Sequence, residues 1–153
     1  MDKNAILIEL SESDRTKFGK EEFSAQSIPQ KVFSSIWTIE SELNNGGFSQ
    51  YFLNGSCETA GFVAEALDTI CAPRTADICR RAIAIAFPSG LPSDHDEISA
   101  AAASFSGDTE ERLAALDQEF LEYPHDLTNL LFDYVSKHPE EFGDLPKSEN
   151  VER

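Results

Sequence analysis

In the stretch ESELNNGGFSQYF, residues 40–52, an amphipathic helix meets a sharp break and then a cluster of aromatic side chains. The helix is expected because apolar residues recur before the break at helical spacing, namely Val32, Phe33, Ile36, Ile39 and Leu43. Gly46 and Gly47 are expected to end it, since glycine adopts positive φ angles without steric cost. The segment Phe48–Leu53 then predicts a short turn that places aromatic rings in the core.

Helical periodicity continues after this stretch. Asn54 and Gly55 break the chain again, and Ser56 is expected to cap a helix that runs to Ile70. Pro73 suits the first turn of the helix that follows.

The second half of the chain predicts three more helices. One runs from Asp94 to Ser104, and the next is expected to be capped by Asp108 with Glu111 and ended by Pro124. The last has the strongest helical period in the chain, in Leu127, Leu130, Leu131, Tyr134 and Val135. Only the run Ala5–Leu10 is compatible with a strand, and it fits the start of a helix equally well. The sequence therefore predicts an all-α fold of about six or seven helices.

Length and composition predict one compact domain. A chain of 153 residues with 41% hydrophobic residues and eleven Phe can bury one core of ordinary size. We expect residues 1–28 to pack as an N-terminal segment on a helical domain at 29–142, and residues 143–153 to form a mobile tail. The early apolar run is too short for a signal peptide or a membrane span, which predicts a cytoplasmic protein.

The negative charge is concentrated in the second half of the chain. Fourteen of the 28 acidic residues lie between Asp94 and Asp144, against only Arg112 and Lys137, so this part carries −12 of the net charge of −16. Direct binding to nucleic acid through phosphate neutralisation is excluded, because it needs clustered Lys and Arg. The same sign excludes anionic membranes and favours a basic partner.

Signatures of catalysis and of metal binding are weak. The cluster Asp94-His95-Asp96-Glu97 offers oxygen and imidazole ligands, but consecutive helical positions point in different directions and cannot converge on one ion. His125 with Asp126 fits a helix start better than a catalytic dyad. Cys57, Cys71 and Cys79 fit neither a disulfide framework nor a zinc site and are expected to be buried thiols. We therefore predict no enzymatic activity, no cofactor and no metal.

The residues around the glycine pair form a motif that we interpret as structural, with Asn44 and Gln50 bonded to backbone groups of the turn. An alternative places Glu40, Asn44 and Gln50 in a polar pocket. The motif consists of Glu42, Asn44, Asn45, Gly46, Gly47, Phe48 and Gln50.

Together with the turn Phe87-Pro88-x-Gly90-x-Pro92, this motif resembles the family of a bacterial DNA-mimic protein of about nineteen kilodaltons, over about residues 29–142. The resemblance implies an α-helical homodimer without enzymatic activity. It also implies that carboxylates imitate the phosphates of duplex DNA, occupy the DNA-binding surface of a helix-turn-helix transcription factor and so relieve repression.

Charge alone must then identify the phosphate mimics, which we expect to be Asp94, Asp96, Glu97, Asp108, Glu110, Glu111, Asp117, Glu119, Glu122 and Asp126. Seven of them lie within residues 108–126, about one per ~4 Å of helical rise, whereas duplex DNA has one charge per roughly 1.7 Å. Mimicry therefore requires that two copies lie side by side, or that this helix lies beside the turn at Asp94–Glu97.

Two other classes of function remain open on sequence grounds. An acidic immunity-type or adaptor protein that neutralises a basic toxin or enzyme would use the same electrostatics on a partner that does not bind DNA. A metal-dependent or small-ligand enzyme would use Glu40, Asn44 and the cluster Asp94–Glu97.

Overall fold

The computed structural model describes residues 2–145, so most of the tail expected at 143–153 lies outside the described residues. Within residues 2–145 the chain forms helices and no strand, which confirms the all-α fold. This range contains nine α-helices. Seven of them correspond to the segments with predicted helical periodicity, if Ala5–Leu10 is counted, and the short helices α3 and α9 are additional. The elements in chain order are α1 (Lys3–Ser11), the 3-10 helix η1 (Phe23–Ala25), α2 (Ile28–Asn45), α3 (Gly47–Leu53), the 3-10 helix η2 (Gly55–Thr59), α4 (Val63–Thr69), α5 (Pro73–Ala86), α6 (His95–Ala102), α7 (Gly107–Leu121), α8 (Leu127–Ser136) and α9 (Pro139–Phe142).

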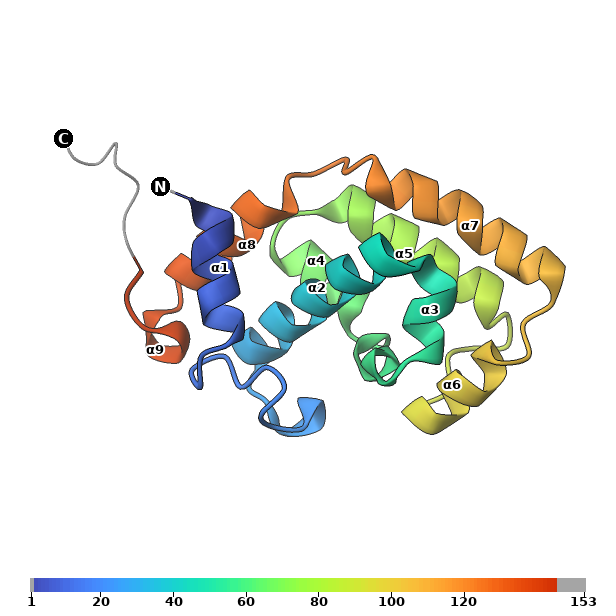
Figure 1. The fold of residues 1–153 in the computed structure, drawn as a ribbon, viewed down its shortest axis with the longest axis horizontal. Coiled ribbons are helices and arrows are strands. Elements are labelled where there is room, and N and C mark those ends of the chain that lie inside the picture. The colour runs from blue at the N-terminus through green and yellow to red at the C-terminus, as the bar shows by residue number, and fades with distance from the viewer. Residues whose placement is uncertain (1, 146–153) are drawn as a thin grey trace.

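Helix α2 lies at the centre of the fold and packs against α3, α4, α7 and α8 (Figure 1). It begins with a capping box, in which the backbone N–H of Gln30 donates to the Ser27 hydroxyl and the backbone N–H of Ser27 donates to the Gln30 side chain. The apolar positions predicted for this helix are all buried. One long helix therefore joins the two halves of the molecule into a single core.

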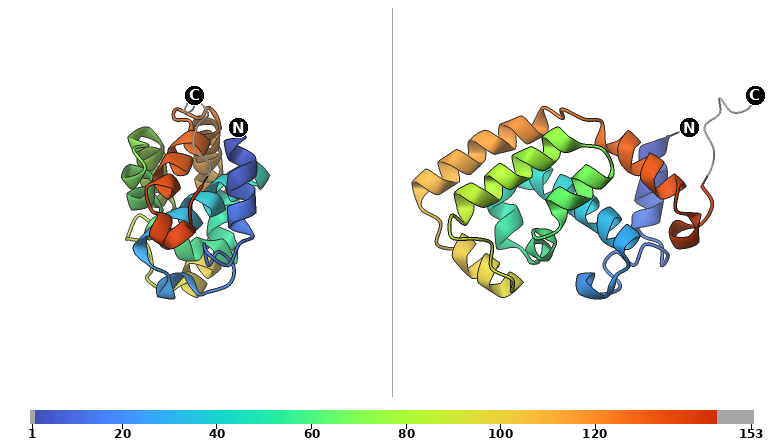
Figure 2. Two further views of the ribbon diagram at one scale, coloured as in Figure 1. Left: turned by 90° about the vertical axis from the view of Figure 1, so that its left-hand side faces the viewer. Right: turned by 180° about the vertical axis from the view of Figure 1, so that it is seen from behind.

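Helices α5 and α7 pack side by side along one long edge of the molecule, while α6 packs on α3 and η2 at the opposite edge (Figures 1 and 2). Aromatic rings connect these layers. Phe48 of α3 meets Phe120 of α7 edge to face, with ring centroids 6.1 Å apart, and Phe52 meets Phe87 at 5.2 Å. The aromatic segment after the glycine pair therefore packs into the core, as predicted.

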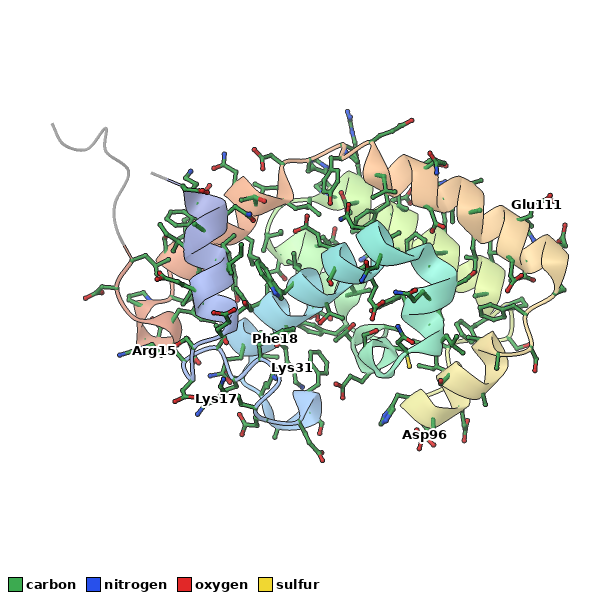
Figure 3. The ribbon with its side chains drawn as sticks, viewed as in Figure 1. Arg15, Lys17, Phe18, Lys31, Asp96 and Glu111 are labelled. Atoms are coloured by element: carbon green, nitrogen blue, oxygen red, sulfur yellow. The ribbon has the colours of Figure 1, made fainter. Side chains whose placement is uncertain are left out.

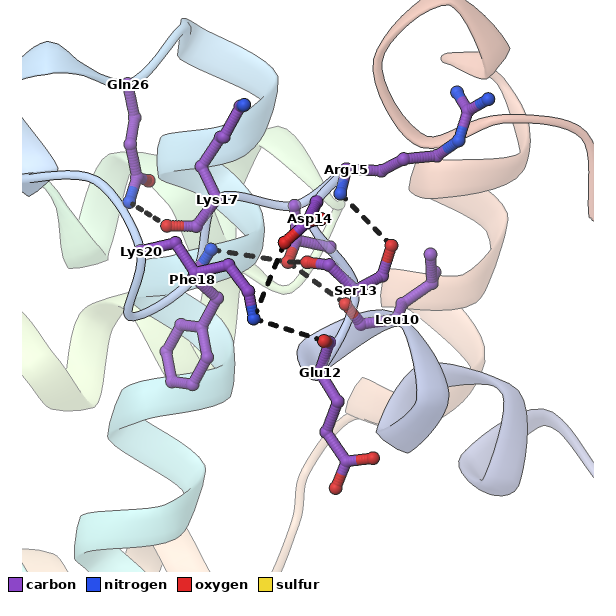
Figure 4. Close-up of polar contacts among 10 residues, drawn as sticks. Leu10, Glu12, Ser13, Asp14, Arg15, Lys17, Phe18, Lys20 and Gln26 are labelled. Carbon is purple, nitrogen blue, oxygen red and sulfur yellow. Dashed lines mark hydrogen bonds and ion pairs between the residues drawn. The ribbon is translucent and has the colours of Figure 1, made fainter.

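The N-terminal segment consists of α1, which packs on α8, and a loop that buried polar side chains hold in place (Figure 4). The Thr16 hydroxyl is buried and donates to the Leu10 carbonyl at 3.0 Å. The amide of Gln26, also buried, donates to the carbonyl of Lys17 and accepts from the Ser34 hydroxyl at 2.8 Å. These bonds fix the backbone of Lys17, whose φ angle is +61°.

Three local predictions are wrong. Phe48–Leu53 is a helix, α3, because a carboxylate from α7 accepts the Phe48 backbone N–H and so satisfies a donor of the first turn. The Ser56 hydroxyl donates to the Glu42 carboxylate and caps no helix, so η2 forms first and α4 begins only at Val63. Ser106 caps α7 by accepting from the Thr109 N–H at 3.1 Å, in place of the predicted pair Asp108 and Glu111.

Candidate functional site

The glycine pair of the motif brings α3 into contact with Asp117 of α7. Gly47 has a φ angle of +86°, and a Cβ atom at this position would collide with the Asp117 carboxylate. The same carboxylate accepts the Phe48 backbone N–H at 2.8 Å. Burial raises the pKa of Asp117, and the bond from Phe48 opposes that shift. Gly47 is therefore required both by its backbone conformation and by the close approach of Asp117.

Glu42 connects three elements of the motif. Its carboxylate accepts from the Gln50 amide at 2.8 Å, from the Ser56 hydroxyl at 2.7 Å and from the Asn54 amide at 3.2 Å. These bonds join α2 to α3 and to η2. Gln50 thus bonds a carboxylate and not turn backbone, which corrects the role predicted for it.

Asn44 belongs to a different cluster, so Glu40, Asn44 and Gln50 do not form one pocket. The Asn44 amide donates at 2.8 Å to the Glu40 carbonyl and at 2.8 Å to the Tyr123 hydroxyl, and that hydroxyl donates to the Glu40 carboxylate at 3.0 Å. Asn45 is exposed at the end of α2. The motif is therefore explained by contacts within the fold, and its side chains tie α2, α3 and the end of α7 together.

We expect the Glu40→Gln variant to be more stable than the unaltered chain at neutral pH. Burial, the largest cause, raises the pKa of Glu40 above its ordinary value of 4.5, the Tyr123 hydrogen bond opposes this, and the charge of Asp126 adds to it. Glu40 has a higher pKa in the folded state than in the unfolded state, so ionisation of its carboxyl lowers the free energy of unfolding. This loss of stability is absent below the unfolded-state pKa and grows as the pH rises toward the folded-state pKa. Melting temperatures at about pH 7 and about pH 4 measure it. Equal gains at both pH values would contradict this assignment, and Glu65→Gln on α4, whose side chain is exposed, is the control.

Eight of the ten carboxylates expected to act as phosphate mimics are exposed, and the other two, Asp117 and Glu119, are partly buried. Asp117 is half-buried against Phe48, as described, and Glu119 pairs with Arg81 of α5. The exposed ones are Asp94, Asp96, Glu97, Asp108, Glu110, Glu111, Glu122 and Asp126.

Five of the exposed carboxylates belong to α7 and the loop after it, and Figure 1 shows that α7 forms one long edge of the molecule. With about 3.6 residues per turn, Asp108, Glu111 and Glu122 lie on one face of α7, opposite the buried stripe of Leu113, Leu116 and Phe120. We call this set the α7 edge, and it consists of Asp108, Glu110, Glu111, Glu122 and Asp126.

Arg81 holds Glu119 in a bidentate pair across α5 and α7. Its two terminal nitrogens lie 2.6 Å and 3.2 Å from the two carboxylate oxygens of Glu119, and its Nε atom lies 3.0 Å from an oxygen of Asp77. The guanidinium lowers the pKa of Glu119. A bidentate pair of this kind fixes the relative position of the two helices, while its exposure keeps its energetic contribution small. Glu119 is therefore neutralised in the folded chain.

Asp94, Asp96 and Glu97 lie apart from the α7 edge. They occupy the start of α6, and Figure 3 shows Asp96 and Glu111 at opposite edges of the molecule. The Asp94 carboxylate accepts the Asp96 backbone N–H at 3.1 Å and so caps α6. The carboxylates of Asp94–Glu97 therefore do not share a face with those of α7 within one chain. Of the two arrangements that would raise the charge density toward that of DNA, only two copies side by side remains.

The other candidate sites have structural roles. His125 accepts the Arg74 backbone N–H at 3.1 Å, and Asp126 caps α8 by accepting from Asn129. Cys57 and Cys79 are buried, and burial raises the pKa of Cys79 to about 12, but Cys71 is exposed, against the prediction. Within residues 2–145 no three His, Cys, Asp or Glu side chains are grouped as metal ligands, and none of the helices described there is long and apolar enough to cross a membrane.

The fold and the α7 edge define an acidic, all-helical single-domain protein with carboxylates displayed along one helix. A family model described as DMP19-like protein matches residues 24–138, and the chain belongs to this family. The family is one of DNA-mimic proteins, which confirms the resemblance seen in the motif. No curated protein and no solved structure matches the chain.

Proposed function

We propose that this protein is a DNA mimic whose α7 edge occupies the DNA-binding surface of a basic helix-turn-helix transcription factor and so relieves repression in the cytoplasm. The observation that carries the proposal is that Asp108, Glu111 and Glu122 are exposed on one face of α7, a helix whose only cation is Arg112. Ordinary exposed helices mix both signs, because opposite charges one turn apart stabilise each other by a few tenths of a kcal/mol. The same face carries exposed Arg112 one turn from Asp108, but carboxylates outnumber it, and a face of net negative charge favours a basic partner.

The proposal includes a homodimer, because the negative charges of one chain are spaced more widely than the phosphates of DNA. The five exposed carboxylates of the α7 edge fall within residues 108–126, which is about one per ~6 Å of helical rise. Two such edges side by side would have one charge per ~3 Å, which is nearer to the duplex value of roughly 1.7 Å but still about half as dense. A dimer with its two α7 edges adjacent is the arrangement that this arithmetic favours.

The direct test is competition with duplex DNA. The tagged chain captures basic proteins at low salt, and each captured transcription factor is then bound to its operator in a gel-shift assay with increasing amounts of the chain. Displacement of the operator is expected. If the captured proteins are basic enzymes or toxins that bind no DNA, an adaptor or immunity role replaces the present proposal.

Direct binding of the partner should weaken steeply with salt. Exposed charges are screened beyond about 8 Å at physiological ionic strength, so the affinity is expected to fall at least ~10-fold between about 50 mM and 200 mM salt. Calorimetric titration of the partner with the chain measures this affinity directly. DNA is left out because its own affinity for the transcription factor also falls with salt. An affinity that is independent of salt would show that apolar contacts, and not the carboxylates, dominate the interface.

A further inference from the structure

A cleft of about 600 Å³ is lined by residues of η1, η2, α6 and the loop before α6. Figure 1 shows α6 at the edge of the molecule opposite α7. Its apolar surface comes from Phe23, Leu91 and Ile98, and the buried thiol of Cys57 also lines it. Gly61 lines the cleft with no side chain, and a Cβ atom there would meet only Leu91, at 3.9 Å. The cleft can therefore accept a side chain with an apolar stem.

The charges at this cleft are negative. Glu22 and Glu58 line it and are exposed, and neither Lys nor Arg is among the described residues that line it. Burial raises the pKa of Cys57, and the negative charges of Glu58 and Asp96 raise it further. Lys31 lies 5.5 Å from the Phe23 ring centroid, outside the lining, and His95 is 3.6 Å from Asp96. The cleft thus combines an apolar base with two free carboxylates.

We propose that this cleft binds the arginine side chain of an extended basic segment of the partner protein. Arginine matches both parts of the cleft, because its methylene stem packs on apolar surface while its planar guanidinium donates two parallel hydrogen bonds to a carboxylate. The stem would contact Phe23, Leu91 and Ile98. The guanidinium would lie between Glu22 and Glu58. The proposal rests on the proposed function only in taking the partner to be a basic protein.

The test uses the full chain and the peptide acetyl-Gly-Leu-Arg-Leu-Gly-amide as the probe. In ¹H–¹⁵N correlation spectra, we expect saturable shifts of the backbone amides of Cys57–Gly61 and His95–Ile98, with a dissociation constant of about 1 mM or below. A peptide with citrulline in place of arginine keeps the shape and loses the charge, and it should bind at least ~10-fold more weakly. Equal binding of both peptides would overturn charge recognition.

Two variants locate the site, with one matched control. Gly61→Leu should fill the cleft and abolish the shifts without a change of charge, and Glu22→Gln with Glu58→Gln should weaken binding at least ~10-fold. Glu110→Gln with Glu111→Gln removes the same charge from the α7 edge and should leave peptide binding unchanged. Shifts confined to α7 would overturn the proposal. So would shifts of the same amides that depend on protein concentration without peptide, since a second copy would then occupy the cleft.

The proposal for the cleft and the proposal for the α7 edge can be overturned independently. Loss of peptide binding while the chain still displaces operator DNA overturns the cleft alone. Peptide binding without any displacement of DNA overturns the DNA-mimic proposal and leaves an arginine-binding surface.

Discussion

Charge reversal of the α7 edge, by Glu110→Lys, Glu111→Lys and Glu122→Lys together, is expected to reduce competition with operator DNA by about 100-fold or more, equivalent to about 2.8 kcal/mol. All three side chains are exposed, and Lys is a good helix former, so the fold should be retained. Glu119 is excluded from this set because a lysine there would face Arg81 and destabilise the packing of α5 on α7. Gel-shift competition measures the loss, and circular dichroism verifies the helix content.

The matched control reverses three exposed acids elsewhere: Glu9→Lys on α1, Glu65→Lys on α4 and Asp133→Lys on α8. This variant has the same net charge as the first. If competition depends on the local row of carboxylates, the control should retain most of it. An equal loss in both variants would mean that only total charge matters, and the α7 edge would then not be the site.

The Gly47→Ala variant is expected to lose about 3 kcal/mol of unfolding free energy, a large effect for the addition of one methyl group. Part of this, about 1 kcal/mol, is the cost of a positive φ angle for alanine. The rest arises because the new Cβ atom displaces the Asp117 carboxylate and leaves the buried Phe48 N–H without its acceptor, a cost of about 1–3 kcal/mol. Urea denaturation measures the change.

Gly19→Ala separates these two contributions. Gly19 has a φ angle of +71°, but a Cβ atom there meets nothing within 4 Å, so only the conformational cost of about 1 kcal/mol is expected. Combining Gly47→Ala with Asp117→Ala should cost less than the sum of the single variants, since the collision then has no partner. Strict additivity would show that the collision with Asp117 is not the cause.

The fold could be predicted largely from periodicity, and the failures have a common physical origin. The buried face of α2 and the proline at the start of α5 follow from local rules and are confirmed. The short helix α3 could not be predicted, because its first turn depends on Asp117, 69 positions away from Phe48 along the chain. Ser56 likewise bonds to Glu42 and not to its own segment. Local rules fail where a distant side chain satisfies the backbone or takes the capping group.

The candidate site is only partly readable from the sequence. The acidic face of α7 follows from helical spacing, whereas the neutralisation of Glu119 by Arg81 requires knowledge that α5 and α7 are neighbours. The distance of Asp96 from that face is equally a tertiary fact. The cleft near Glu58 gives no signal in the sequence, since η1, η2 and α6 supply its lining from three separate segments.

The bond from Phe48 to Asp117 has a consequence for recognition. It anchors α7 to α3 in the C-terminal half of α7, while the Arg81 pair joins α7 to α5, so the outward carboxylates of α7 are presented from a backbone that is already ordered. A flexible acidic peptide would lose about 1–2 kcal/mol of backbone entropy per residue on forming the same array, and α7 avoids this loss at the moment of association. In the proposed complex, Phe48 and Arg81 would therefore strengthen binding through preorganisation of α7 without touching the partner.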